Sequence, residues 1–232
     1  MGKIQNIEQI IHCATQHFAL QGYAETSLRQ IVEEAGVGLG TINFYFQTKE
    51  ELFLAVIQRV INEINRERRE ILEEARIGGM NIERVLEAIM WPLISRMVSD
   101  DPAERRMSYL LRWATLGPGP VEQAVRKMFD PICAELIEAI MEAVPGLRRS
   151  DAVWGMSVAV SMLYSRQVLD QRYEHLMPLP TKERDLAWAK DCTRRLTGII
   201  AGGLLSVADG EHQVLTGPSH TSVSGRRALS RS

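Results

Sequence analysis

Hydrophobic residues recur at steps of three and four along almost the whole chain, a pattern typical of helices that bury one face. No alternating pattern of useful length predicts a strand. The predicted helices run from Asn6 to Gly22, Thr26 to Ala35, Gly38 to Phe46 and Thr48 to just before Gly78, and then over 81–99, 101–116, 120–144, 150–174 and 183–207. The sequence therefore predicts an all-α fold of about nine helices.

Polar residues and glycines mark where these helices begin and end. Three predicted starts carry a capping residue followed three positions later by Gln or Glu, namely Asn6 with Gln9, Ser27 with Gln30, and Thr48 with Glu51. Gly22 and Gly36 are placed to end the first two helices. Pro92 lies inside the fifth helix and predicts a kink there.

The chain divides into three parts. Residues 1–50 hold three short helices, residues 51–208 hold the longer ones, and from Asp209 onward Gly, Ser, His and Arg replace the apolar period. Such a composition cannot bury enough apolar surface to fold, so we expect residues 209–232 to be disordered. The segment Gly117-Pro118-Gly119-Pro120 predicts a turn between two of the longer helices.

Composition indicates a globular protein in a reducing compartment. Of the 232 residues 45% are hydrophobic, and the three cysteines lack the spacing of a disulfide framework or a metal site. The N-terminus lacks the apolar segment of a signal peptide. The longest nearly apolar run, Ala152 to Tyr164, is shorter than the roughly 20 residues of a membrane-spanning helix. We therefore expect a soluble cytoplasmic protein with no membrane contact.

The first part has the arrangement of a helix-turn-helix, because a tight turn containing Gly36 joins its second and third helices. In that motif the third helix lies in the major groove of DNA and the second crosses the backbone. Hydroxyls and backbone amides at the starts of the second and fourth helices could bind phosphates, and small residues let the third helix approach the bases. The predicted DNA-binding residues are Thr26, Ser27, Leu39, Gly40, Thr41, Phe44, Tyr45, Thr48 and Lys49.

Charge by itself does not indicate DNA binding. Residues 1–50 carry three basic side chains (Lys3, Arg29 and Lys49) and five acidic ones (Glu8, Glu25, Glu33, Glu34 and Glu50), which is not a basic patch. Some contacts also have structural alternatives: Thr26 could be only a helix cap, Leu39 could be buried in the turn, and Phe44 could pack on the fourth helix. A ligand-binding or scaffold protein with weakened DNA binding therefore remains the alternative.

At these residues the sequence resembles the tetracycline-repressor (TetR) family. The resemblance covers about residues 7–57 and rests on Ile10-Ile11-His12-Cys13-Ala14, Phe18, Gly22, Thr26-Ser27, Ile31, Ala35-Gly36-Val37, Gly40, Phe46 and Lys49-Glu50-Glu51-Leu52. It departs from the family at Gly38, where Ser is common, and at Asn43, where Tyr is common. Asn43-Phe44-Tyr45-Phe46 is similar to a variant in the subgroup that responds to fatty acids or acyl-CoA, and residues 105–165 faintly resemble that subgroup.

The resemblance implies a homodimer with a DNA-reading N-terminal domain and a helical ligand-binding and dimerisation domain. Residues 150–174 and 183–207 of two subunits would form a four-helix bundle. Unliganded dimers would place two third helices in successive major grooves, about 34 Å apart. A ligand would displace the fourth helix and alter that spacing. The expected function is a ligand-responsive transcription regulator, a repressor released from double-stranded operator DNA by a small apolar effector.

Met and Trp are concentrated after residue 80, and these side chains form adaptable apolar walls. The predicted ligand-pocket residues are Trp91, Ile94, Tyr109, Arg112, Trp113, Met128, Phe129, Trp154 and Met162. Each could instead be an ordinary core residue. Arg112 lies near the face that Tyr109 and Trp113 share. Its guanidinium could bind a ligand carboxylate or a CoA phosphate, or it could pair with Glu122 or Glu138.

Other chemistries find little support in the sequence. His12, Cys13 and His17 do not share one helical face, so their spacing does not favour a metal site. Cys133 and Cys192 fit small core residues better than a redox switch. The chain has no Gly-rich phosphate loop, no Gly-x-Ser-x-Gly, no His-Glu-x-x-His and no convincing pair of catalytic carboxylates. The sequence therefore favours a regulator over an enzyme, without cofactor or metal.

Overall fold

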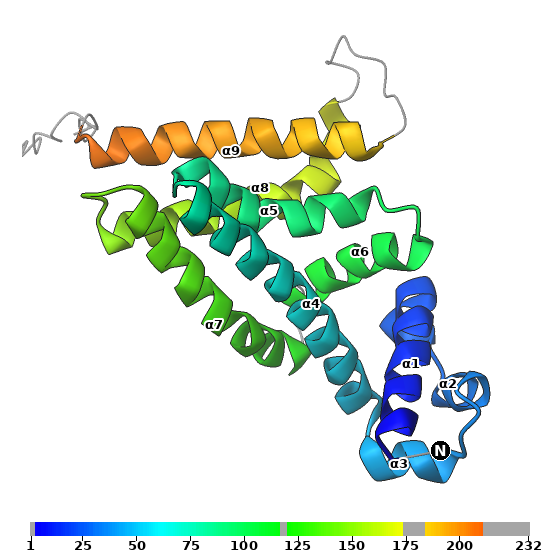
Figure 1. The fold of residues 1–232 in the computed structure, drawn as a ribbon. Coiled ribbons are helices and arrows are strands. Elements are labelled where there is room, and N and C mark those ends of the chain that lie inside the picture. Colours follow the sequence, from blue (N-terminus) through cyan, green and yellow to red (C-terminus); the bar gives the residue numbers. More distant parts are fainter. Residues whose placement is uncertain (1–2, 117–119, 174–183, 211–232) are drawn as a thin grey trace, which may run out of the picture.

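The computed structural model describes residues 3–116, 120–173 and 184–210, and that part of the chain holds nine α-helices and no strand. The helices are α1 (Lys3–Glu25), α2 (Leu28–Glu34), α3 (Leu39–Tyr45), α4 (Lys49–Gly78), α5 (Ile82–Met97), α6 (Pro102–Leu116), α7 (Pro120–Ala143), α8 (Arg149–Tyr173) and α9 (Leu186–Ala208). Figure 1 shows α1–α3 clustered at one end, α9 lying across the other end, and α4 running between them. The all-α prediction is confirmed. Most of the predicted turn at 117–120, and the predicted tail beyond Gly210, lie outside the described residues.

Two of the three predicted caps occur as expected. At the start of α2 the Ser27 hydroxyl accepts a hydrogen bond from the Arg29 amide, and the Gln30 side chain accepts one from the Ser27 amide at 3.3 Å. At the start of α4 the Thr48 hydroxyl accepts from the Glu51 amide at 3.1 Å. These bonds satisfy amide groups that have no partner inside the helix, and they fix where each helix begins.

The predicted cap at Asn6 is wrong, because α1 already begins at Lys3. Lys and Gln are good helix formers, so nothing in Lys3-Ile4-Gln5 stops the helix from continuing toward the N-terminus. The predicted end of this helix is better placed. Gly22 has φ 81° and ψ 172°, a conformation that only glycine adopts without strain, and it interrupts the helical geometry.

A single stripe of buried residues runs along the 30 residues of α4 and serves two different clusters of helices. Its first half packs on α1, and its second half packs on α5 and α7. Near the start of the stripe Phe53 meets Phe18 and Tyr23, with ring centroids 5.1 and 5.0 Å away. The buried stripe consists of Leu52, Phe53, Val56, Ile57, Val60, Ile61, Ile64, Asn65, Arg68, Leu72 and Ala75. The two ends of the molecule are therefore joined by one rigid element.

The last helix, α9, lies against α5 and α8. Its approach to α8 depends on Gly155, because a Cβ atom there would lie 2.6 Å from Cδ2 of Leu204. Leu204 is buried beside the groove between α8 and α9, so its side chain would have to shift before a methyl group fits at Gly155. None of the described helices is long and apolar enough to cross a membrane.

We predict that Gly155→Ala destabilises the protein by about 1–3 kcal/mol, because the added methyl group overpacks the α8–α9 contact. Gly40→Ala is the matched control, since a Cβ atom there meets nothing within 4 Å. The control should leave stability unchanged or raise it by about 0.5–1 kcal/mol through helix propensity. Urea denaturation of both variants measures the difference, and Leu204→Ala should partly rescue Gly155→Ala. Equal stabilities for Gly155→Ala and the unmodified chain would contradict this packing.

Candidate DNA-binding surface and ligand site

The outward face of α3 is uncharged and rich in apolar side chains. Phe44 is 73% exposed and Leu39 is 42% exposed. The two structural alternatives, packing of Phe44 on α4 and burial of Leu39 in the turn, are therefore wrong. Gly40 is exposed, while Thr41 and Tyr45 are half-buried. The Phe44 ring meets the Tyr45 ring edge-on at 5.1 Å. The structure thus brings together the five α3 residues that the sequence selected.

Asn43 is also exposed on α3, although the sequence analysis treated it only as a departure from a family pattern. Its amide could donate to and accept from a base edge, which is the pairing that asparagine makes with adenine. The sequence did contain a signal for Asn43. It lies four residues after Leu39, and therefore on the same face of the helix as a residue that was selected.

The hydroxyl groups at the helix starts are already engaged within the protein. Thr26 is buried, and its hydroxyl donates to the carbonyl of Gly22 at 2.7 Å. Thr26 therefore stabilises the chain between α1 and α2 and does not present its side chain to a phosphate. Ser27 and Thr48 act as helix caps and are half-buried and exposed, respectively.

Lys49 also has a structural role that the sequence did not indicate. Its ammonium group donates to the carbonyl of Ala24 at 2.9 Å and lies 4.9 Å from the centre of the Tyr23 ring. An ammonium has three donors, so one bond to the protein leaves donors for a phosphate. Arg29, in the first turn of α2, is a second and fully exposed cation near the Ser27 cap, and it was missing from the predicted DNA-binding residues.

Two contacts fasten α1 to the rest of the molecule. Arg106 of α6 donates to the carbonyl of Leu20 at 2.9 Å, and Arg59 of α4 pairs with Glu8 at 3.1 Å. Between these contacts lies a cleft of about 220 Å³ where α1 meets α4, α5 and α6, with Arg96 and Glu104 in its lining. These two polar contacts link α1 to α4 and α6.

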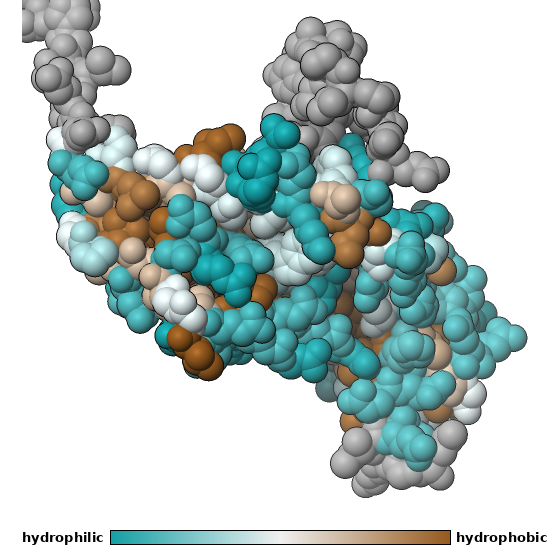
Figure 2. All heavy atoms as spheres, turned by 45° about the horizontal axis from the view of Figure 1, so that its top comes forward, coloured by the Kyte–Doolittle hydropathy of each residue, from teal (hydrophilic) through white to brown (hydrophobic). Residues whose placement is uncertain are grey.

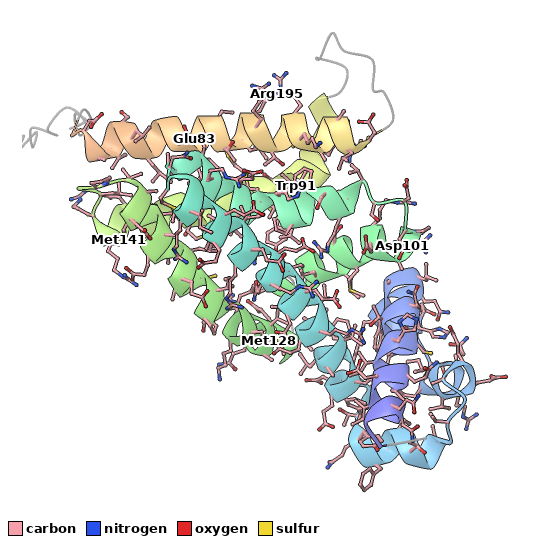
Figure 3. All side chains as sticks on the ribbon, viewed as in Figure 1. Glu83, Trp91, Asp101, Met128, Met141 and Arg195 are labelled. Atoms are coloured by element: carbon pink, nitrogen blue, oxygen red, sulfur yellow. The ribbon has the colours of Figure 1, made fainter. Side chains whose placement is uncertain are left out.

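Among the described side chains, the predicted ligand-pocket residues do not line one common pocket. Figure 3 shows Trp91 on α5 beneath α9, and Met128 far from it on α7. Ile94 is buried in the interior at 1% exposure, whereas Trp154 is 71% exposed. Trp154 and Met162 instead line an outward groove of about 340 Å³ between α8 and α9. Helical spacing predicts which residues share one face of a helix. It does not predict which neighbouring helix that face packs against.

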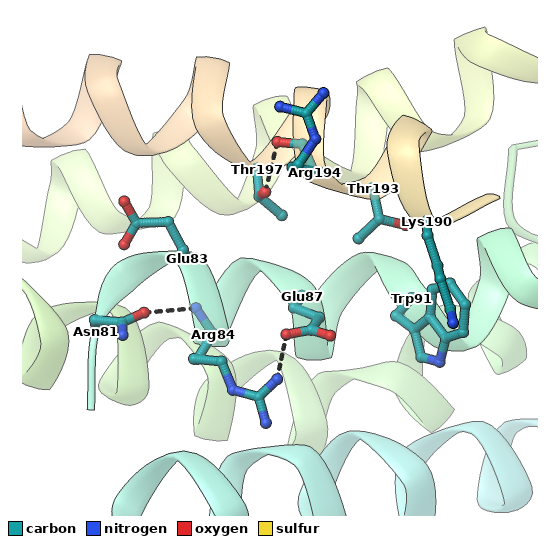
Figure 4. A pocket seen from close by; sticks show the side chains of 9 residues that line it. All are labelled: Asn81, Glu83, Arg84, Glu87, Trp91, Lys190, Thr193, Arg194 and Thr197. Atoms are coloured by element: carbon teal, nitrogen blue, oxygen red, sulfur yellow. Dashed lines mark hydrogen bonds and ion pairs between the residues drawn. The ribbon is translucent and has the colours of Figure 1, made fainter. Parts of the chain in front are cut away.

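Trp91 lines a separate groove of about 410 Å³ between α5 and α9, and its other lining residues are polar or charged. Figure 4 shows the charged side chains of Arg84, Glu87 and Lys190 around it. Arg84 and Glu87 form an ion pair there.

The side chains of Tyr109, Arg112 and Trp113 lie outside the described residues, so the predicted Arg112 anchor stays a prediction. The two carboxylates suggested as its partners are engaged elsewhere. Glu122 pairs with Arg126, and Glu138 pairs with Arg149.

A different arginine, Arg68 of α4, lies in the interior with 4% exposure. It donates to Asn65 Oδ1 at 3.0 Å and to the carbonyl of Ile89 at 3.3 Å. Its guanidinium carbon is 5.9 Å from the centre of the Phe129 ring, which makes Phe129 the one predicted pocket residue in contact with a buried charge among the described residues. Sequence reasoning missed Arg68. The available signal was a charged residue on the apolar stripe of α4, four residues after Ile64 and four before Leu72.

No group of three or more His, Cys, Asp or Glu side chains within the described ranges could hold a metal ion. Cys13 and Cys192 are buried, and burial raises the pKa of the Cys13 thiol. A thiol in that state is a poor nucleophile and metal ligand.

Two family models match the chain. Residues 10–56 match the model described as bacterial regulatory proteins, tetR family, and residues 87–203 match the tetracyclin repressor-like C-terminal domain. The first model spans α2 and α3 together with the parts of α1 and α4 that pack on them, and the second spans most of α5–α9.

Curated relatives share shorter segments. The HTH-type transcriptional regulator YhgD of Bacillus subtilis (strain 168) is 33% identical over 81 residues, or 35% of this chain and 42% of the relative. The fatty acid metabolism regulator protein of the same organism is 34% identical over 68 residues, or 29% of this chain and 35% of the relative. The matched stretches thus span less than half the length of these relatives.

Solved structures show the same fold over nearly the whole chain. The fatty acid degradation regulator FadR from Bacillus halodurans has a TM-score of 0.62 at 16% identity, covering 86% of this chain and 96% of that one. FadR from Bacillus subtilis in complex with stearoyl-CoA has a TM-score of 0.64 at 15% identity, covering 84% and 98%. A TetR-family regulator from Mesorhizobium loti has a TM-score of 0.63 at 17% identity, covering 89% and 98%.

We predict that Lys49→Met lowers the free energy of unfolding by about 1 kcal/mol, because it removes a charged hydrogen bond and a cation–π contact. Arg29→Met is the matched control and should leave stability within about 0.5 kcal/mol, as is usual for an exposed surface position. Thermal and urea unfolding of the two variants check the contrast. If both behave alike, Lys49 has no structural role.

Proposed function

The chain belongs to the tetracycline-repressor family of transcription regulators, and on that premise we propose that it is a repressor released from its operator by a small, largely apolar effector. The family consists of DNA-binding regulators rather than enzymes, so no reaction needs to be assigned. We place the DNA-binding domain at residues 1–50 and the ligand-binding and dimerisation domain at 51–208.

The observation that carries the proposal is the continuity of α4. One helix begins at Lys49, beside the exposed face of α3, and passes the interior residue Arg68 about 28 Å further along its axis. An effector that moves the second half of α4 must also move its start. The contact between Arg106 and the Leu20 carbonyl gives α6 a second path to α1.

The energetic demand on this coupling is modest. An allosteric coupling of about 1–3 kcal/mol between effector and operator changes DNA affinity roughly 5- to 150-fold. The effector acts only if it binds the DNA-incompetent arrangement more tightly than the competent one. A change in the spacing of two α3 helices across a dimer supplies that difference, because successive major grooves lie about 34 Å apart.

Homodimerisation through α8 and α9 is part of the proposal. Figure 2, which turns the α9 side forward, shows hydrophobic patches interrupting the hydrophilic surface, one of them near the C-terminal end of α9. Apolar side chains exposed on these helices include Val153, Trp154, Val158, Ile199 and Leu205. Gly198, Gly202 and Gly203 have open space around them in one subunit. Glycine weakens a helix by about 0.5–1 kcal/mol relative to alanine, which the close approach of a second subunit would offset.

The fatty-acid and stearoyl-CoA names belong to relatives that are either partial matches or below 20% identical, so they support an acyl effector only as a proposal. The test is release of a labelled operator, first selected from a random duplex pool, while acyl compounds and uncharged hydrophobic molecules are titrated. A protein that binds no duplex even at low salt would instead be the ligand-binding or scaffold alternative.

We predict that Phe44→Ala weakens binding to the selected operator without changing stability, because the ring is largely exposed. Lys49→Ala should weaken binding to all sequences and reduce the slope of log affinity against log salt by about one phosphate contact.

Changes at Thr41 or Tyr45 should alter which duplexes are selected, since these residues reach base edges in the proposed docking. Mobility shifts over a salt series check all three. An unchanged salt slope for Lys49→Ala argues against the docking.

We predict that Ile199→Glu converts dimers into monomers, because it places a charge in the centre of the proposed α8–α9 bundle. Leu20→Glu is the control, since Leu20 is also exposed but lies on α1 at the other end of the molecule. Sedimentation at micromolar concentration distinguishes the two states. A monomeric unmodified chain would rule the dimer out.

A further inference from the structure

Arg68 is a buried cation that has no carboxylate beside it in the part of the chain that the structure describes. The adjacent carboxylate, Glu67, is engaged by Arg96 instead, with N–O distances of 2.5 and 2.8 Å. Burial lowers the pKa of the Arg68 guanidinium, yet arginine remains protonated in proteins. An isolated buried charge is costly, and buried charges are normally paired.

The hydrogen bonds of Arg68 leave one edge of the guanidinium incomplete. Nη1 donates to Asn65 Oδ1 at 3.0 Å, and Nη2 makes one long bond of 3.3 Å to the carbonyl of Ile89. Nε is buried and has no hydrogen-bond partner. Nε and Nη2 form the side of a guanidinium that binds a carboxylate with two parallel hydrogen bonds. The unsatisfied donor is therefore on the edge suited to a carboxylate.

The carboxylate of Glu67 raises the pKa of Arg68 but bonds Arg96, and no ion pair joins a described carboxylate to Arg68. The Phe129 ring faces the guanidinium at 5.9 Å. Cys133 of α7 lies close enough to influence the pKa of Arg68, but burial raises the pKa of its own thiol, which stays neutral. Tyr164 of α8 is buried and also raises the pKa of Arg68. No described residue therefore supplies Arg68 with a directly bonded anion.

We propose that Arg68 anchors the carboxylate of a lipophilic effector whose apolar part lies among the side chains of α4, α5, α7 and α8. This proposal rests on the proposed function and makes its effector more specific. One guanidinium balances one negative charge. A free carboxylate fits that balance, whereas a CoA thioester brings no carboxylate and several phosphate charges, and an uncharged ligand leaves Arg68 unpaired.

A purely structural role for Arg68 is the competing explanation. Pro92 has no amide hydrogen, so the carbonyl of Ala88 loses its intrahelical donor, and Arg68 bonds the carbonyl of Ile89, the next residue of α5. If the role of Arg68 is only structural, the protein should not distinguish ligands that carry a carboxylate from ligands that carry an uncharged head group. The two explanations therefore differ in how the protein responds to ligands that share one chain and differ at the head.

The experiment measures thermal stabilisation of the full-length protein by octanoate, laurate and palmitate, by the alcohols of the same chain lengths, and by palmitoyl-CoA. The carboxylates should stabilise the unmodified chain more than the matched alcohols do. Arg68→Met should raise the concentration of carboxylate needed by about tenfold or more, and leave the alcohols unaffected. Arg69→Met is the matched control, because the exposed Arg69 pairs with Glu135 at 2.8 Å on the surface; it should respond like the unmodified chain.

The proposal is overturned if none of the carboxylates stabilises the unmodified chain, or if Arg68→Met responds to them as the unmodified chain does. It also fails if Arg112→Met, rather than Arg68→Met, abolishes the preference for a carboxylate. If Arg68→Met does not fold, Arg68→Lys takes its place. Lysine keeps the charge but lacks the two-bond edge, so a weakened carboxylate response supports the anchor and an unchanged one contradicts it.

Operator release in parallel separates this proposal from the function on which it rests. Release by an uncharged compound alone would leave the repressor intact and remove the Arg68 anchor. Carboxylate binding through Arg68 in a protein that binds no duplex would keep the anchor and remove the repressor.

Discussion

Helix α4 has to place one stripe of buried residues against two separate groups of helices, and the rest of the structure depends on that constraint. Phe53 belongs to an aromatic cluster with α1, while Leu72 and Ala75 are buried at the other end of the same helix. A helix of 30 residues cannot bend sharply without a proline or a glycine inside it, and α4 has neither before its last residue. Movements at one end are therefore passed on to the other.

Charge in this protein is mostly kept at the surface and paired. Arg59, Arg69, Arg76 and Arg84 each have a carboxylate within 4 Å and are partly or largely exposed. Such exposed pairs contribute little to stability. Arg68 differs because it occupies a position where the helical repeat calls for an apolar residue. Burying an unpaired cation costs free energy, which is why the proposed carboxylate anchor and the structural bond to Ile89 are the two explanations to be separated.

The end of the molecule that holds α3 has few charged side chains on its proposed DNA-binding face. The recognition helix α3 carries no charge, and the nearest basic group, Lys49, already donates a hydrogen bond within the protein. Binding that depended mainly on phosphate charge would be weak with so few cations. In the proposed docking, contacts from the exposed α3 residues Leu39, Phe44 and Asn43 would supply more of the affinity, which favours selective over general DNA binding.

The sequence by itself determined the helices, most of their boundaries and the family, because these depend on local spacing, capping residues and an ordered motif. Ser27, Gly22 and Thr48 act where the pattern placed them. Only the tertiary structure decided how the helices face one another. It placed Trp154 on an outward groove, buried Thr26, gave Lys49 a bond to α1, and left Arg68 inside without an anion among the described residues. Helical periodicity defines a face but not its neighbour, and the cost of a buried charge exists only once packing has removed the water around it.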